Sequence, residues 1–99
     1  MKIIDPAVLT TFRNNPRCEL CGRDTRKGAH PHHAYARGLG GGSHLDHEWN
    51  LIAACAWCHR LVHDGNIPRA TVWATIGQRY GISGEWARER VLELLRASK

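Results

Sequence analysis

Two pairs of cysteines constrain the fold of this chain more strongly than any other feature. Cys18 and Cys21 form one C-x2-C pair, and Cys55 and Cys58 form a second pair after residues 22–54. Each pair places two sulfurs on one side of a tight turn, and two such turns complete a tetrahedral thiolate shell, which selects zinc over harder ions. A closed thiolate shell has no open position, so this zinc is predicted to stabilise the fold and not to take part in chemistry. Disulfides or buried thiols are the alternative interpretations.

The length and charge of the chain favour a small domain that binds a polyanion. A chain of 99 residues is expected to form one domain, and its hydrophobic core is marginal without a metal or disulfides. The formal net charge is +5, and all but three of the 14 basic residues are arginine, which suits bidentate contacts to phosphate. Nucleic acid is therefore the favoured partner, and a merely solvated basic surface is the alternative.

The sequence also predicts a soluble protein of the cytoplasm that does not interact with membranes. Its N-terminal stretch lacks the apolar core and the cleavage site of a signal peptide, and no run approaches the roughly 18 apolar residues of a membrane span. In a reducing compartment, cysteines serve as metal ligands more often than as disulfides.

Caps, glycines and apolar periodicity predict an α+β fold. Asp5 and Pro6 are typical of a helix start, Pro31 disfavours helix at the residue before it, and Ser83 is typical of a cap of the last helix. The expected elements are a helix over 7–13, a strand over 30–36, a flexible loop over 38–43, and helices over 58–64, from 68 to 81, and from 83 onward.

Histidines form a second candidate metal site. His59 and His63 are separated by four residues on a predicted helix and therefore share one face, and His32 is a candidate third ligand. Neighbours on an extended strand point to opposite sides, so His32 and His33 do not easily bind one ion together. One of them can ligate, while the other is a candidate general base, because imidazoles titrate near neutral pH. Arg37 is a candidate phosphate ligand just before a glycine run, which admits bulky groups.

The order of these motifs resembles that of the HNH endonucleases. The matching segments are CELCG, PHHAYARGLGGG, EWNLIAAC and CAWCHRLVH, which together cover residues 18–63. The resemblance implies a ββα-metal core, in which two strands and a helix hold one divalent ion. It places this core at about residues 16–65 of a single domain, 1–99, with a helical extension over about 66–99.

The resemblance also implies roles for individual residues. His32, His59 and His63 match ligands of the catalytic ion, and His33 matches the general base that activates water. Asn50 matches the asparagine that holds the hairpin loop. The implied activity is metal-dependent hydrolysis of phosphodiester bonds in double-stranded DNA, with 5′-phosphate and 3′-hydroxyl products.

One departure from the family pattern concerns the ion. Many relatives have Asp where this chain has His32, and a site of imidazoles shifts preference from Mg²⁺ towards Zn²⁺, Ni²⁺ or Mn²⁺. Arg37 and Arg60 are the candidate phosphate ligands because they lie beside the motifs. Asp46 and His47 are near enough to Asn50 to support the site.

Two other functions compete with the nuclease. A non-catalytic zinc module that binds DNA would use the same cysteines, but it gives no reason for histidines and asparagine in motif order. A protein-interaction domain would use Trp73 and Trp86 as a docking face, although ordinary core packing is favoured for both. Small HNH chains also serve in phages, so phage packaging proteins are candidate partners, while the sequence does not indicate the oligomeric state.

Overall fold

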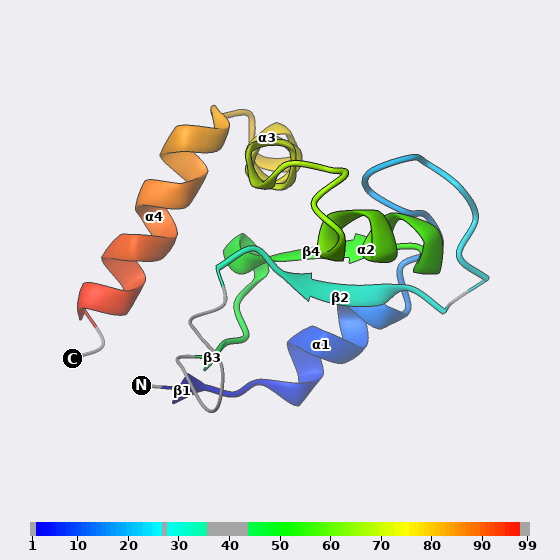
Figure 1. Ribbon diagram of the computed structural model, residues 1–99. Coiled ribbons are helices and arrows are strands. Elements are labelled where there is room, and N and C mark those ends of the chain that lie inside the picture. Colours follow the sequence, from blue (N-terminus) through cyan, green and yellow to red (C-terminus); the bar gives the residue numbers. More distant parts are fainter. Residues whose placement is uncertain (1, 27, 36–43, 98–99) are drawn as a thin grey trace.

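The computed structural model describes residues 2–26, 28–35 and 44–97, and its elements confirm the α+β class. Its centre is an antiparallel pair of strands, β2 (His30–His33) and β4 (Leu51–Ala54), in which His30 lies opposite Ala54 and His33 opposite Leu51. Helix α1 (Pro6–Arg13) covers one face of this pair, and helix α2 (Ala56–His63) packs on the other (Figure 1). The strand pair is thus the platform for everything that follows.

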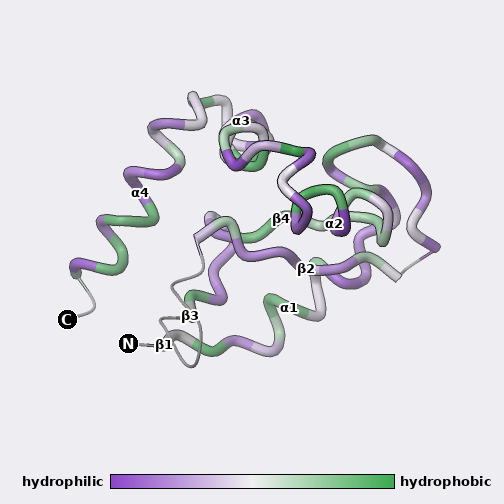
Figure 2. The backbone as a smooth tube through the Cα atoms, viewed as in Figure 1, coloured by the Kyte–Doolittle hydropathy of each residue, from purple (hydrophilic) through white to green (hydrophobic). Residues whose placement is uncertain are grey.

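Strand β4 is fully buried, and its side chains alternate between the two faces of the strand pair. Leu51 and Ala53 pack with Phe12 of α1, whereas Ile52 packs with the helices that follow α2. Figure 2 shows this apolar strand next to the hydrophilic strand β2. Because opposite residues of an antiparallel pair point to the same face, His33 shares the α1 face with Leu51, and His32 shares the other face with Ile52.

Helices α3 (Arg69–Tyr80) and α4 (Gly84–Ala97) pack against each other beyond the strand pair (Figure 1). Gly81 ends α3 with a left-handed φ of 71°, as its C-terminal position requires. A Cβ atom on Gly77 would lie 2.4 Å from the carbonyl oxygen of Ile82, so this close approach needs glycine. The main core cluster joins both helices to the strand region through Leu45, Ile52, Val72, Trp73, Ile76, Ala87 and Val91.

Three short elements complete the fold. Strand β1 (Lys2–Ile3) pairs in parallel with β3 (His44–Leu45), and the 3-10 helix η1 (Glu48–Asn50) leads into β4. Helix α1 starts as predicted: the side chain of Asp5 accepts the N–H of Val8. No helix in the part of the chain that the structure describes is long and apolar enough to cross a membrane.

Several predicted boundaries were wrong, and each error has a local cause. Strand β2 ends at His33 and not at residue 36, because the backbone of Tyr35 bonds to the side chain of Asn50. Helix α2 starts at Ala56, two residues earlier than predicted. The last tryptophan was expected in the core, but Trp86 is 66% exposed. Residue 37 and the glycine loop over 38–43 lie outside the described residues.

Candidate functional site

The cysteines form a cluster whose geometry suits one metal ion. The sulfurs of Cys18, Cys21, Cys55 and Cys58 all lie within 4.8 Å of one another, and all but Cys21 are buried. The Cys21 and Cys55 sulfurs are 3.8 Å apart, which matches about 3.8 Å between thiolates on one tetrahedral zinc ion. None of these cysteines is in a disulfide. The cluster is therefore close enough to hold a metal ion, as the spacing predicted.

Glu19, between the first two cysteines, joins the two cysteine pairs. Its backbone N–H donates to the carbonyl of Ala53 at 2.8 Å, and its side chain accepts the N–H of the same residue at 2.9 Å. The guanidinium of Arg79 binds both carboxylate oxygens of Glu19, at 2.8 and 3.0 Å, and also donates to the carbonyls of Glu48 and Leu51. The first cysteine turn is thereby fixed to β4, which leads directly into the second pair.

The thiols of the cluster differ in their acidity. Burial raises the pKa of Cys18, but backbone N–H groups at Cys55, Cys21 and Leu20 outweigh it and bring the pKa to about 7. Burial, followed by the neighbouring cysteine sulfurs, raises the pKa of Cys58. Thiolates so close together repel one another, so a cation among them is needed for all of them to ionise.

The predicted histidine ligands also lie close together. The ring centroids of His59 and His63 on α2 are 5.1 Å apart, and the His32 ring lies 5.5 Å from the first and 6.4 Å from the second. His30 stacks on His59 with centroids 5.1 Å apart, because alternate residues of β2 share a face. We did not predict a role for His30, although this alternation was visible in the sequence.

The histidine cluster is more open than the cysteine cluster. Two imidazoles on one tetrahedral ion have centroids about 5 Å apart, because each metal–nitrogen bond is about 2 Å. Two of the three separations agree with that value, whereas the 6.4 Å between His32 and His63 exceeds it. Among the described residues, only the cysteines bring three or more ligand atoms within 4.8 Å of one another. His63 is exposed on α2, so its imidazole can adopt other rotamers than the one seen here.

The surroundings keep the central imidazole neutral. Burial, and then the nearby rings of His59, His63 and His33, lower the pKa of His32 to about 4. Burial and the neighbouring His30 and His63 rings also lower the pKa of His59. Neutral imidazole is the form that binds metal ions, and the lowered pKa values of His32 and His59 favour that form at neutral pH.

His33 has a partner that the sequence only hinted at. Its Nε2 lies 2.6 Å from Oδ1 of Asp46, a carboxylate that is only 4% exposed. The second carboxylate oxygen of Asp46 accepts the backbone N–H of Asp5 at 3.0 Å. The two neighbouring histidines of β2 thus serve different groups: His32 meets the imidazoles of α2, and His33 meets a buried carboxylate. His47, by contrast, accepts the N–H of Trp49 and caps η1.

Asn50 is fully buried and connects both sides of the loop between β2 and β3. Its amide group donates to the carbonyls of Tyr35, at 3.1 Å, and Leu45, at 3.0 Å. Its side-chain oxygen accepts the N–H of Tyr35 at 2.8 Å. The three bonds saturate the buried amide and hold the two stems of this loop at a fixed separation.

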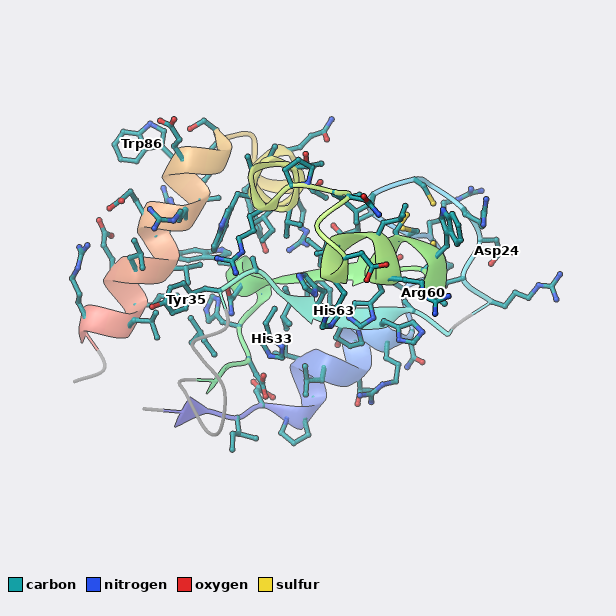
Figure 3. All side chains as sticks on the ribbon, in the orientation of Figure 1. Asp24, His33, Tyr35, Arg60, His63 and Trp86 are labelled. Carbon is teal, nitrogen blue, oxygen red and sulfur yellow. The ribbon has the colours of Figure 1, made fainter. Side chains whose placement is uncertain are left out.

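A cavity of about 250 Å³ opens beside the histidine cluster. The described residues that line it come from β2, the two residues after it, the end of α2 and the start of α3: His32, His33, Ala34, Tyr35, Val62, His63, Arg69 and Val72. Arg60, a predicted phosphate ligand, is exposed on α2 but does not line the cavity; in Figure 3 it lies between His63 and Asp24. Arg37 lies outside the described residues, and Arg69 carried no sequence signal that pointed to the site.

No family model matches this chain, and neither a curated protein nor a solved structure matches it. The family resemblance therefore rests on the motif residues themselves, and the function has to be argued from the site.

Proposed function

We propose that this chain is a metal-dependent endonuclease of the HNH type that hydrolyses phosphodiester bonds in double-stranded DNA. In this proposal the cysteine cluster holds a structural zinc ion, and the histidine cluster holds a second divalent ion. The β2–β4 pair and helix α2 then form a ββα-metal core, and α1, α3 and α4 flank it.

The observation that carries the proposal is the different environment of two adjacent histidines. His32 lies among the helix imidazoles, whose chemistry suits a divalent ion, and His33 lies 2.6 Å from the carboxylate of Asp46. A hydrolase needs both functions side by side, a ligand for an ion and a base for water. A purely structural role would not explain why both residues line one cavity.

The second ion would be held by His32, His59 and His63. When bound, a divalent ion stabilises negative charge on the scissile phosphate and on the leaving oxygen. The imidazole ligands favour Zn²⁺, Ni²⁺ or Mn²⁺ over Mg²⁺. Three protein ligands leave coordination positions for water and substrate, which the four-cysteine cluster does not.

His33 acts as the base in this mechanism. It takes a proton from water, the water oxygen attacks phosphorus, and the bond from phosphorus to the 3′ oxygen breaks, leaving a 5′-phosphate. The Asp46 carboxylate accepts the proton on Nε2, so the lone pair of neutral His33 lies on Nδ1, and the same carboxylate compensates the charge that the ring gains. Asp46 is thus a positioning residue, and Asn50 holds the loop stem that follows His33.

A plasmid assay tests the proposal. Purified protein is incubated with supercoiled plasmid in EDTA or with Mn²⁺, Ni²⁺, Zn²⁺ or Mg²⁺, and nicked and linear products are measured on gels. We expect cleavage only with a divalent ion, and a loss of about 100-fold or more in His33→Ala. His47→Gln is the matched control, because His47 caps η1 outside the cluster, and it should cleave like the wild type.

Each alternative predicts another outcome of the same assay. DNA that is retarded in the gel but uncut with every metal would favour the zinc-stabilised DNA-binding module. Cleavage that survives in His33→Ala, with zinc content and far-ultraviolet circular dichroism unchanged, would contradict the role of the base. Adding candidate phage packaging proteins to the assay tests that proposed partnership.

A further inference from the structure

Arg69 places a cation in the histidine cavity. It is the first residue of α3, and it lines the cavity together with His32, His33 and His63. No other lysine or arginine among the described residues lines it. This position was not apparent from the sequence, because Arg69 lies outside every motif and reaches the site only through the packing of α3.

The start of α3 is held firmly, so the position of Arg69 is well defined. Val72, three residues later, lines the same cavity and is only 2% exposed, because it belongs to the main core cluster. Residues three apart share one face of a helix, so burial of Val72 directs the Arg69 face towards the cavity. Pro68 precedes the helix with the fixed φ of proline, −66°, and limits motion of the first turn.

Among the residues that the structure describes, none forms a hydrogen bond or an ion pair with the guanidinium of Arg69. Among the described residues, no carboxylate lies within ion-pair distance of it, whereas Arg79 binds Glu19 and two carbonyls, and Arg90 lies over the ring of Trp49. The latter two arginines therefore have structural partners, whereas Arg69 is exposed and lines the cavity.

Arg69 is the one lysine or arginine among the described residues that line the cavity, and no acidic side chain is among them. The other lining residues carry apolar groups, imidazoles and one tyrosine. A phosphodiester carries one negative charge, and a guanidinium offers it paired N–H donors in a planar arrangement. We propose that Arg69 binds a backbone phosphate of DNA in this cavity. This inference rests on the proposed nuclease function, for which it identifies the substrate-positioning cation.

Binding and cleavage are measured separately to test it. DNA affinity is measured by fluorescence anisotropy with a short labelled duplex over a series of salt concentrations, in a His33→Ala background that does not cut. Arg69→Ala should weaken binding about tenfold at low salt and reduce the slope of log K against log salt by about one. Arg69→Lys should keep most of the slope, because it keeps the charge, but should bind more weakly than arginine. Arg88→Ala on α4 is the control for loss of one positive charge outside the cavity.

The two proposals can fail independently. If Arg69→Ala binds and cleaves like the wild type, or no worse than Arg88→Ala, while His33→Ala abolishes cleavage, then the Arg69 proposal is overturned and the nuclease proposal stands. If the wild type never cuts DNA but Arg69→Ala still lowers affinity and salt slope, the nuclease proposal fails and the phosphate contact stands. Circular dichroism and zinc content of each variant exclude misfolding as the cause.

Discussion

The cysteine cluster and the histidine cluster share helix α2 but differ in how completely the fold arranges their ligand atoms. All four cysteine sulfurs lie within 4.8 Å of one another, and three of them are buried. The histidine rings lie 5.1 to 6.4 Å apart, between half-buried and exposed positions. Figure 3 shows His63 on the open side of α2 next to β2. The cysteine sulfurs are already close enough to hold one ion, whereas the imidazoles are more widely spaced and more exposed.

The difference follows from what holds each ligand. The cysteines lie on tight backbone turns: Gly22 donates to the carbonyl of Cys18, and Cys55 caps α2 by accepting the N–H of Cys58 at 3.4 Å. Short side chains on fixed turns leave the sulfurs little freedom. The histidines lie on a strand and a helix and retain rotation of their longer side chains, so the backbone fixes their ring nitrogens less closely than it fixes the cysteine sulfurs.

The largest expected effect comes from substitutions at two adjacent positions of α2, one in each cluster. Cys58→Ser should abolish the cooperative fold, since apparent zinc-binding energies of about 10 kcal/mol or more support small domains of this kind. His59→Ala, one residue further along α2, should keep the fold and the zinc and lose only binding at the histidine cluster. Circular dichroism and zinc analysis measure both. A folded, zinc-free Cys58→Ser protein would show that the cysteine ion is not structural.

Asn50→Ala should produce the next largest effect. It should lower stability around the loop between β2 and β3 without disturbing the cysteine cluster. It removes three hydrogen bonds and leaves buried backbone groups of Tyr35 and Leu45 without partners, so we expect a loss of about 3 kcal/mol in unfolding free energy. Urea denaturation measures it. Asn66→Ala is the control, because Asn66 is exposed, and it should change stability by less than about 0.5 kcal/mol. Loss of zinc from Asn50→Ala at low urea would mean that the loop held by Asn50 and the cysteine cluster do not unfold independently.

Acidification should lower the unfolding free energy through His32. The pKa of His32 is lowered to about 4, so between pH 6.5 and pH 4 the unfolded chain binds a proton that the folded protein does not. Stability therefore falls as the pH falls through this range. From pH 7 to pH 5.5 we expect a loss of at most about 1 kcal/mol in the protein with zinc at the cysteines only, because His32 is partly solvated.

His32→Gln distinguishes this effect from general acid sensitivity. Urea titrations at several pH values measure the unfolding free energy of both proteins. Between pH 7 and pH 5.5 this free energy should fall in the wild type and should change much less in the variant. If zinc release, followed with a chelating dye, already accounts for the whole change, then the cysteine cluster and not His32 controls stability in this range.

The smallest expected effect concerns His30. It stacks on His59, and the proposal assigns it no role as a ligand, so His30→Ala should lower Ni²⁺ or Co²⁺ affinity at the histidine site by about threefold or less. His59→Ala should lower it by more than about tenfold. Isothermal titration of zinc-loaded protein measures both. If His30→Ala lowered metal affinity as much as His59→Ala, His30 would be a ligand. The histidine cluster would then have four protein ligands, like the cysteine cluster.

Local chemistry determined much of this protein in advance. The C-x2-C spacing identified the four cysteines that meet, Asp5 and Pro6 identified the start of α1, and strand alternation separated His32 from His33. These features depend on residues a few positions apart, where spacing alone sets geometry. The start of α2 was placed too late because the N-cap is Cys55, which is not among the residue types that usually signal a helix start.

Only the tertiary structure decided which groups complete the site. Asp46 reaches His33 across 13 positions, Asn50 bonds to Tyr35 across 15, and Arg69 enters the cavity because Val72 is buried in a core built from α3, α4 and β4. Trp73 is buried and Trp86 is exposed, although both lie in amphipathic helices with similar patterns. Contacts over such distances depend on how whole elements pack, and no local spacing, cap or periodicity encodes that packing.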